Sequence, residues 1–330
     1  MIDRSPSGLR AEAAFRRPPN SIMAISPLYL PSNCQSAYQL NWSLSVFGKE
    51  RLPSPSECID ALRIEVAKDQ LKILECEYRA PNVAMFFLSS QPSASPSQIV
   101  RSIKGRWQHL SRATDRIEFR RNYRIDSVGD ANAIVLDEYV AKQAAKHRMA
   151  DERVQAMFES MQYHDPNVDL GDIQRSSYGE FIYALQIVLE SESGWNEVRS
   201  DVLKAYRGAV IGTCRKHQWR LARIGLLSNH LHLLIGPAMT DSPEGVALAL
   251  MNNLAYTQGM KAILRWSYYA GGFGKNDRGS IWNAGGETGE TELPTGPSPT
   301  ESEIANSDFG SCQMHSRRVN PTESNFTIRI

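Results

Sequence analysis

Two histidines lie one residue apart within an apolar run, Asn229-His230-Leu231-His232-Leu233-Leu234-Ile235. In an extended strand, side chains at positions i and i+2 point to the same face. His230 and His232 would therefore project side by side, with Leu231 and Leu233 anchoring the opposite face. Imidazoles presented in this way can bind one divalent metal ion. The alternative is a pair of buried histidines bonded to backbone carbonyls, which is the commoner situation for an isolated His-x-His.

A second candidate group lies on an expected helix from about Ala131 to Arg148. Tyr139 and Gln143 are four residues apart, so on a helix they share one face. A tyrosine hydroxyl has a pKa of about 10 and is a weak nucleophile at neutral pH unless it is activated. A divalent ion could polarise a phosphate and stabilise the charge that develops there. On spacing alone, a half-buried core aromatic and a solvent-facing amide are the simpler interpretations.

Basic residues cluster in one stretch of a chain whose formal net charge is only +1. Eight lie between Arg101 and Arg124, against Asp115 and Glu118. Such a belt suggests that one face contacts a polyanion, where cations neutralise phosphates and an aromatic ring stacks on an unpaired base. A solvated, salt-bridged face is the alternative, and for the tryptophan the alternative is core packing. The candidates for DNA contact are Arg101, Lys104, Arg106, Trp107, Arg120 and Arg121.

The overall composition is that of a soluble globular protein. The 330 residues are 42% hydrophobic and 22% charged, enough for two domains with tails. No apolar run approaches the roughly 20 residues that cross a bilayer, so no membrane partner is expected. Residues 1–35 lack the apolar core of a secretory signal. The five cysteines form no C-x-x-C pair, which favours reduced thiols and a cytoplasmic location.

The expected elements occur in an order that repeats. The first series is a strand at Tyr38–Phe47, a helix from Glu57 to about Lys68, strands at Leu71–Tyr78 and Val83–Ser89, and a helix from Ser95 to about Arg112. The second is a strand at Phe181–Leu189, a helix from about Asn196 to Lys216, strands at Trp219–Leu227 and His230–Ile235, and a helix that opens at Ser242.

An offset of 147 residues carries Asn82 to Asn229, Ser95 to Ser242 and Pro96 to Pro243. These matches in order indicate a tandem duplication. The predicted organisation is a flexible lead (1–35), a first domain (36–150), a linker (151–177), a second domain (178–282) and a low-complexity tail (283–330).

The two copies differ where chemistry is expected. Val83 and Met85 occupy the positions of His230 and His232 in the first copy, and they are not ordinary ligands of a divalent metal. Conversely, no counterpart of the tyrosine helix follows Trp282. Each copy therefore lacks what the other has kept.

These segments resemble the single-tyrosine HUH transposases, which include insertion-sequence and REP-associated tyrosine transposases. The resemblance covers roughly Ala37 to Trp282 in two copies. Its most specific parts are Asn229–Leu234 and Tyr139–Gln143, supported by Arg120–Gly129 and by the helix Ile99–Leu110. It implies an α+β fold of two tandem ferredoxin-like antiparallel sheets. It also implies cleavage of single-stranded DNA, usually beside hairpins, with a tyrosine nucleophile and Mg²⁺ or Mn²⁺.

By this resemblance, Tyr139 attacks the DNA and becomes joined to a 5′ end, while Gln143 completes a metal site with His230 and His232. Family members often share such a site across a homodimer, so the duplication implies a monomer that is an internal pseudo-dimer with one composite site. The partner would be single-stranded or hairpin DNA. Two alternatives remain open: a domesticated DNA-binding protein that no longer cuts, and a metal hydrolase unrelated to DNA.

Overall fold

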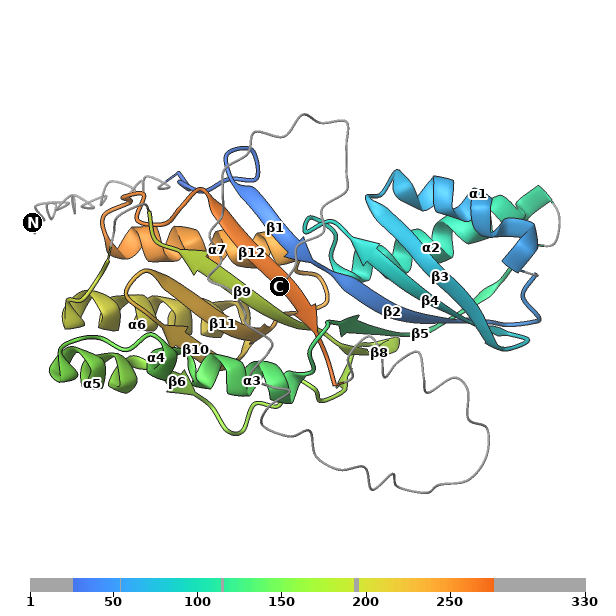
Figure 1. Cartoon of the computed structure of the whole chain (residues 1–330). Helices are drawn as coiled ribbons and strands as arrows, with labels where there is room; N and C mark the ends of the chain where they lie inside the picture. The colour runs from blue at the N-terminus through green and yellow to red at the C-terminus, as the bar shows by residue number, and fades with distance from the viewer. Residues whose placement is uncertain (1–25, 54, 114–115, 193–195, 276–330) are drawn as a thin grey trace, which may run out of the picture. The chain divides into compact units, whose positions relative to one another are not determined.

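The computed structural model describes residues 26–53, 55–113, 116–192 and 196–275. The predictions for residues 1–25 of the lead and for the tail at 283–330 lie outside these ranges. Within them the chain forms two six-stranded sheets and seven α-helices, which confirms the α+β class (Figure 1).

The order of elements in the first copy recurs in the second. The first copy contains β1 (Gln35–Gln39), β2 (Asn41–Gly48), α1 (Pro55–Ala67), β3 (Leu71–Ala80), β4 (Val83–Ser90), α2 (Pro96–Leu110), the 3-10 turn η1 (Ser111–Ala113) and β5 (Phe119–Val128). The second copy contains β8 (Gly179–Ile182), β9 (Ala184–Glu190), α6 (Ser200–His217), β10 (Arg220–Leu226), β11 (His230–Gly236), α7 (Pro243–Thr257) and β12 (Ser267–Phe273). The first copy then continues with α3 (Ala133–Ala141) and α4 (Gln143–Lys146). Between the copies lie α5 (Glu152–Met161), β6 (Tyr163–His164) and β7 (Gln174–Arg175).

The starts of α2 and α7 show the repeat in atomic detail. Ser95 caps α2 by accepting a hydrogen bond from the backbone N–H of Gln98, and Ser242 caps α7 by accepting one from Gly245. A proline opens each helix, where the missing N–H is no loss. These are the serine and proline pairs that the 147-residue offset relates.

The two copies exchange strands. β1 pairs in parallel with β12 of the second copy, and β8 pairs in parallel with β5 of the first. One sheet therefore has the order β1-β12-β9-β11-β10-β6 and the other β3-β4-β2-β5-β8-β7. The chain passes from one sheet to the other at Leu40 and again at Tyr183, which are the single residues between β1 and β2 and between β8 and β9. The sheets therefore do not coincide with the predicted 36–150 and 178–282 boundaries.

Ser127 joins the sheets where the copies meet. Its hydroxyl donates to the carbonyl of Phe273 at 2.5 Å and accepts from the N–H of Ala184 at 3.0 Å. The side chain is 1% exposed, so these bonds are shielded from water. The crossing point is therefore a specific, hydrogen-bonded contact between the copies.

Two segments expected to be irregular are structured. Residues 151–177 contain α5, β6 and β7, and β6 extends the edge of β10. Leu28 and Tyr29 belong to the predicted lead, and their backbone N–H groups donate hydrogen bonds to the side chain of Asn252 in α7. Tyr29 is 1% exposed. Both segments are therefore part of the packed fold.

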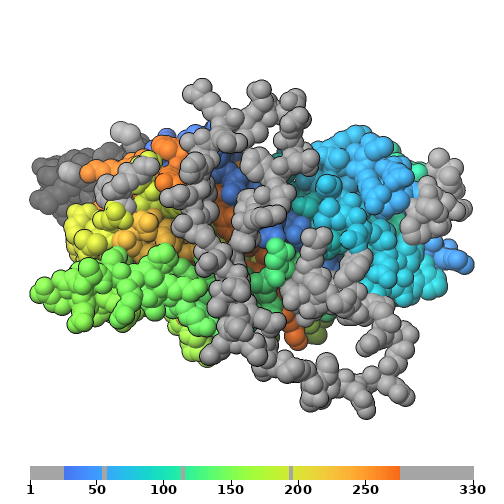
Figure 2. All heavy atoms as spheres, in the orientation of Figure 1, coloured from blue at the N-terminus to red at the C-terminus, as the bar shows by residue number. Residues whose placement is uncertain are grey.

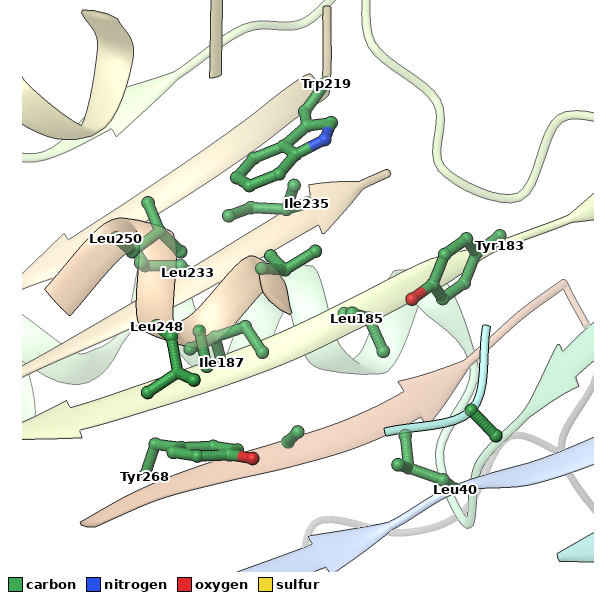
Figure 3. Close-up of a cluster of buried hydrophobic side chains, with 14 of the residues drawn as sticks. Leu40, Tyr183, Leu185, Ile187, Trp219, Leu233, Ile235, Leu248, Leu250 and Tyr268 are labelled. Carbon is green, nitrogen blue, oxygen red and sulfur yellow. The ribbon is translucent and has the colours of Figure 1, made fainter. Parts of the chain in front are cut away.

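The second copy's sheet is packed on both faces. On one face Leu185, Ile187, Leu233 and Ile235 lie against Leu248 and Leu250 of α7 (Figure 3). On the opposite face a smaller cluster contains Val140 of α3 together with Ala222, Leu234 and Phe273. The green atoms of α5 lie along the yellow atoms of the second copy (Figure 2). Among the described residues, no helix has the length and apolar character needed to cross a membrane.

Candidate active site

The predicted tyrosine helix breaks in two and lies on the sheet of the second copy. Lys142 separates α3 from α4, and the Asn132 side chain caps α3 by accepting from the N–H of Val135 at 3.0 Å. Asp137 of α3 and Arg223 of β10 form a two-point ion pair, with both N–O distances at 2.6 Å. Because the Arg223 side chain is only 14% exposed, this pair fixes the helix on the strand.

A glycine allows the helix to approach the strand closely. A Cβ atom on Gly225 of β10 would lie 2.7 Å from Cγ1 of Val140, closer than side-chain contacts allow. Gly225 pairs with His232 across β10 and β11. The absence of a side chain at Gly225 therefore sets the distance between α3 and the strand that carries the histidines.

The structure brings Tyr139 and the histidine pair together. The ring centroids of Tyr139 and His232 are 5.7 Å apart with an edge-to-face geometry, and those of His230 and His232 are 4.9 Å apart. The two imidazoles lie on the same face of β11, as the strand period predicts. His232 is 6% exposed and His230 is intermediate. The tyrosine comes from the first copy and the histidines from the second.

Gln143 lies one helical turn after Tyr139 and is 2% exposed. Its Nε2 donates to the backbone carbonyl of Tyr139 at 3.2 Å, which bridges the break between α3 and α4. This bond occupies the amide nitrogen, so the oxygen Oε1 is the atom with which Gln143 could contact a cation. The simpler interpretation of Gln143 as a solvent-facing amide is wrong.

Two residues of the site were missed from the sequence. The ring of His147 lies 5.6 Å from that of His230, edge to face, and the Lys146 ammonium lies 5.4 Å from the centroid of the Tyr139 ring. The spacing Tyr139, Gln143, His147 is i, i+4, i+8 and could have indicated a shared helix face. Lys146 places a positive charge beside the tyrosine ring.

Burial makes both histidines of the pair poor bases. Desolvation, with the nearby His147 adding repulsion, lowers the pKa of His230 to about 4. Desolvation, followed by repulsion from His230 and His147, lowers the pKa of His232 to about 3. Both imidazoles are therefore neutral at pH 7 in the metal-free protein, which is the form that binds metals.

The site offers a divalent ion two adjacent imidazoles, those of His230 and His232. Nδ1 of His232 is buried and has no hydrogen-bond partner, while Nδ1 of His230 lies 2.7 Å from Oδ1 of Asn229. A buried polar nitrogen without a partner is costly unless something binds it. Among the described residues no group of three or more His, Cys, Asp or Glu side chains could hold a metal ion. A metal site here therefore needs the oxygen of Gln143, water or the substrate as further ligands.

The lowered histidine pKa values predict a pH-dependent stability in the metal-free protein. Unfolding returns each pKa to about 6.5, so below that pH the unfolded chain takes up protons that the folded chain does not. The contribution of these two histidines to the free energy of unfolding is therefore fully present above about pH 6.5. It is lost as the pH falls toward 4. We expect the melting temperature in EDTA to fall less steeply over this range for His232→Gln than for the wild type. Parallel profiles would show that the pair does not titrate in this way.

The structure corrects part of the proposed DNA-binding set. Trp107 is 1% exposed and packs edge to face against Phe86, so its ring is not available to stack on a base. Arg106 forms ion pairs with Glu65 of α1 and with Asp69, which follows that helix, and these carboxylates offset its charge. Trp107 holds α2 in place from the core face, which it shares with Ile99 and Ile103. Arg106 ties α2 to α1 and to the residues that follow it.

Lys104 also has a structural contact. Its ammonium donates to the backbone carbonyl of Arg120 at 2.6 Å and so links α2 to β5, and desolvation lowers its pKa. Arg101, Arg120 and Arg121 are exposed, and among the described residues none of the three is in an ion pair with a carboxylate. A surface hollow at the start of β5 is lined by Lys49, Lys104, Gln108, Glu118, Phe119, Arg120 and Arg121.

The exposed arginines Arg101, Arg120 and Arg121 form a basic surface on the first copy. At the 147-residue offset, Arg101 and Lys104 of α2 correspond to Leu248 and Met251 of α7. The whole of α7 lacks a basic residue. The two copies therefore differ in charge as well as in the histidine pair.

Comparison with known proteins does not assign a family. No protein-family model matches the chain, and no curated protein matches it. Among solved structures, a 1.90 Å crystal structure of a "putative transposase" from Deinococcus radiodurans R1 matches with 18% sequence identity and a TM-score of 0.25. The match covers 32% of this chain and 92% of that chain. A likeness this distant carries no weight for function, which has to be inferred from the site itself.

Proposed function

We propose that this protein is a metal-dependent, transposase-like enzyme that nicks and rejoins single-stranded DNA through Tyr139. The observation that carries the proposal is the 5.7 Å approach of Tyr139, from the first copy, to His232, from the second. Two neutral imidazoles beside a tyrosine, in a chain with exposed arginines, match phosphodiester transfer better than hydrolysis of a neutral substrate. One chain supplies the whole site, so the active species is a monomer.

In the proposed reaction, the Tyr139 hydroxyl gives its proton to solvent water and its oxygen attacks the phosphorus of a phosphodiester. A tyrosine–phosphate bond forms and the bond from phosphorus to the 3′ oxygen breaks. The 3′ oxygen takes up a proton from solvent water and leaves as a free hydroxyl. The reverse attack by a 3′ hydroxyl rejoins the strand, because the covalent intermediate conserves the phosphodiester. The Lys146 ammonium, 5.4 Å from the centroid of the Tyr139 ring, would attract the negatively charged phosphate.

His230 and His232, with Oε1 of Gln143, would hold Mg²⁺ or Mn²⁺. When bound, the ion supplies a positive charge that polarises the scissile phosphate. The protein's own contribution is position. The Asp137–Arg223 ion pair holds the tyrosine helix on the sheet, and Gly225 sets its distance from the histidines.

A covalent adduct tests the proposal. A hairpin oligonucleotide labelled at its 3′ end is incubated with protein and Mn²⁺ and then separated by denaturing electrophoresis. We expect label to migrate with the wild-type protein and no such adduct with Tyr139→Phe, because the nucleophilic oxygen is gone. Tyr256→Phe is the matched control, since Tyr256 is 62% exposed and lies in the last turn of α7. An adduct that persists in Tyr139→Phe would show that another residue attacks.

Mixing two variants tests whether one chain holds the whole site. We expect Tyr139→Phe mixed with His232→Ala to form no adduct, because neither chain has both groups. Recovery of the adduct would instead show a site shared between chains. A wild-type protein that binds the oligonucleotide but forms no adduct would match a DNA-binding protein that no longer cuts, an alternative favoured by the lack of a third His, Cys, Asp or Glu ligand among the described residues.

A further inference from the structure

An exposed tyrosine lies beside the basic surface. Tyr178 is 55% exposed, and it lies just before β8 in the tight turn that joins β7 to β8. A single exposed ring is ordinary on a protein surface, so the feature that points to a ligand is the cation that lies on this ring.

The turn that carries Tyr178 is firmly held. The N–H of Ser176 donates to the carbonyl of Gly179 at 2.8 Å, and the N–H of Gly179 donates to the Ser176 hydroxyl at 3.0 Å. The hydroxyls of Tyr123 and Ser176 are 2.9 Å apart. A Cβ atom on Gly179 would lie 2.6 Å from Cε2 of Tyr123, so the turn is packed closely on β5. Tyr178 is therefore presented on a rigid support and loses little freedom when a ligand binds.

A guanidinium group lies over the same ring. The Cζ atom of Arg121 is 5.5 Å from the centroid of the Tyr178 ring, and Arg121 is exposed. Among the described residues no carboxylate forms an ion pair with Arg121, while Glu180, two residues after Tyr178, pairs with Arg124 and Arg175. The exposed Arg120 is its neighbour in the chain. An aromatic ring with a cation on it and a second cation nearby is the combination that holds unpaired bases and their phosphates.

We propose that Tyr178 and Arg121 form a platform that stacks on an unpaired DNA base, and thereby select single-stranded DNA over duplex. The proposal rests on the DNA-binding part of the proposed function. It gives Tyr178 the stacking role that burial denies to Trp107. The duplex has no free base face to offer the ring, so its contact with this surface is limited to phosphates.

Binding in EDTA tests the platform without any cleavage step. Fluorescence anisotropy is measured with a labelled oligothymidylate of roughly 12 nucleotides, within the usual site size, and with a blunt duplex. We expect Tyr178→Ala to weaken binding of the oligothymidylate by about five- to a hundredfold, and Tyr178→Phe to retain it, because a phenyl ring still stacks. Binding of the duplex and the salt dependence should change little.

The matched control is Tyr256→Ala, which removes another exposed tyrosine that has no cation on its ring among the described contacts. Tyr178→Ala overturns the platform if it binds the oligothymidylate like the wild type, or if it loses duplex binding equally. A loss in Tyr256→Ala as large as in Tyr178→Ala also overturns it. A wild type that binds neither DNA contradicts the proposed function as well, whereas wild-type binding without cleavage contradicts only the nuclease.

Discussion

Replacing either His230 or His232 with alanine is expected to reduce metal-dependent DNA cleavage by about a hundred- to thousandfold, the usual cost of losing one group that stabilises transition-state charge. The physical reason is that two neutral, largely buried imidazoles are the main nitrogen donors beside Tyr139. DNA binding should persist, because the exposed arginines lie on the first copy. Titration calorimetry with Mn²⁺ should show heat for the wild type and none for either variant.

The duplication provides matched controls for this experiment. Val83 and Met85 occupy the same strand positions in β4 of the first copy, so Val83→Ala and Met85→Ala remove side chains at equivalent places. We expect both to leave Mn²⁺ binding and cleavage intact. If His230 and His232 only fill space, their alanine variants would lower the melting temperature by the same amount with and without Mn²⁺, and the metal role would be wrong.

Gly225→Ala is expected to reduce cleavage by about a hundredfold, since a displacement of about 1 Å in a reacting group can cost that much. The added methyl group would lie 2.7 Å from Cγ1 of Val140, so α3 has to move away from β10 and take Tyr139 with it. The cost in stability should be only about 1–3 kcal/mol, as for other overpacked sites. Cleavage rates and chemical denaturation of the same preparation separate the two effects.

Two further variants make this test specific. Gly225→Ala combined with Val140→Ala removes the clashing methyl group and should recover most of the cleavage. Gly208→Ala, in α6, meets nothing within 4 Å and should leave cleavage unchanged. If Gly225→Ala cuts like the wild type, the spacing between helix and strand does not control the reaction.

The sequence predicted the local elements and the grouping of the key side chains well. The strand period placed His230 and His232 on one face, and serine–proline pairs placed the starts of α2 and α7. The reciprocal losses at Val83 and Met85 and after Trp282 suggested that Tyr139 would face the histidines, and the structure has the two groups adjacent. These inferences succeed because they depend on short-range geometry and on the internal repeat.

Contacts distant in sequence could not be predicted. Nothing local shows that β1 pairs with β12, or that Arg106 meets Asp69. Core packing was one of the two interpretations of Trp107, and its spacing with Ile99 and Ile103 favours it. The basic residues around Trp107 favoured the other interpretation, a stacking role at the surface. Tyr178 is the first residue of the predicted second domain, and only the pairing of β8 with β5 brings it to Arg121 of the first copy.

The exchange of strands affects how the chain is made on the ribosome. Gln35 of β1 pairs with Ser267 of β12, so this edge of the sheet has no partner until nearly all of the described fold has been synthesised. At roughly 5–20 residues per second, the wait is on the order of 10–50 s. The outer edge of β5 is open as well until β8 emerges. Unpaired strand edges can pair with another chain, so both edges are open to aggregation until the second copy has been synthesised.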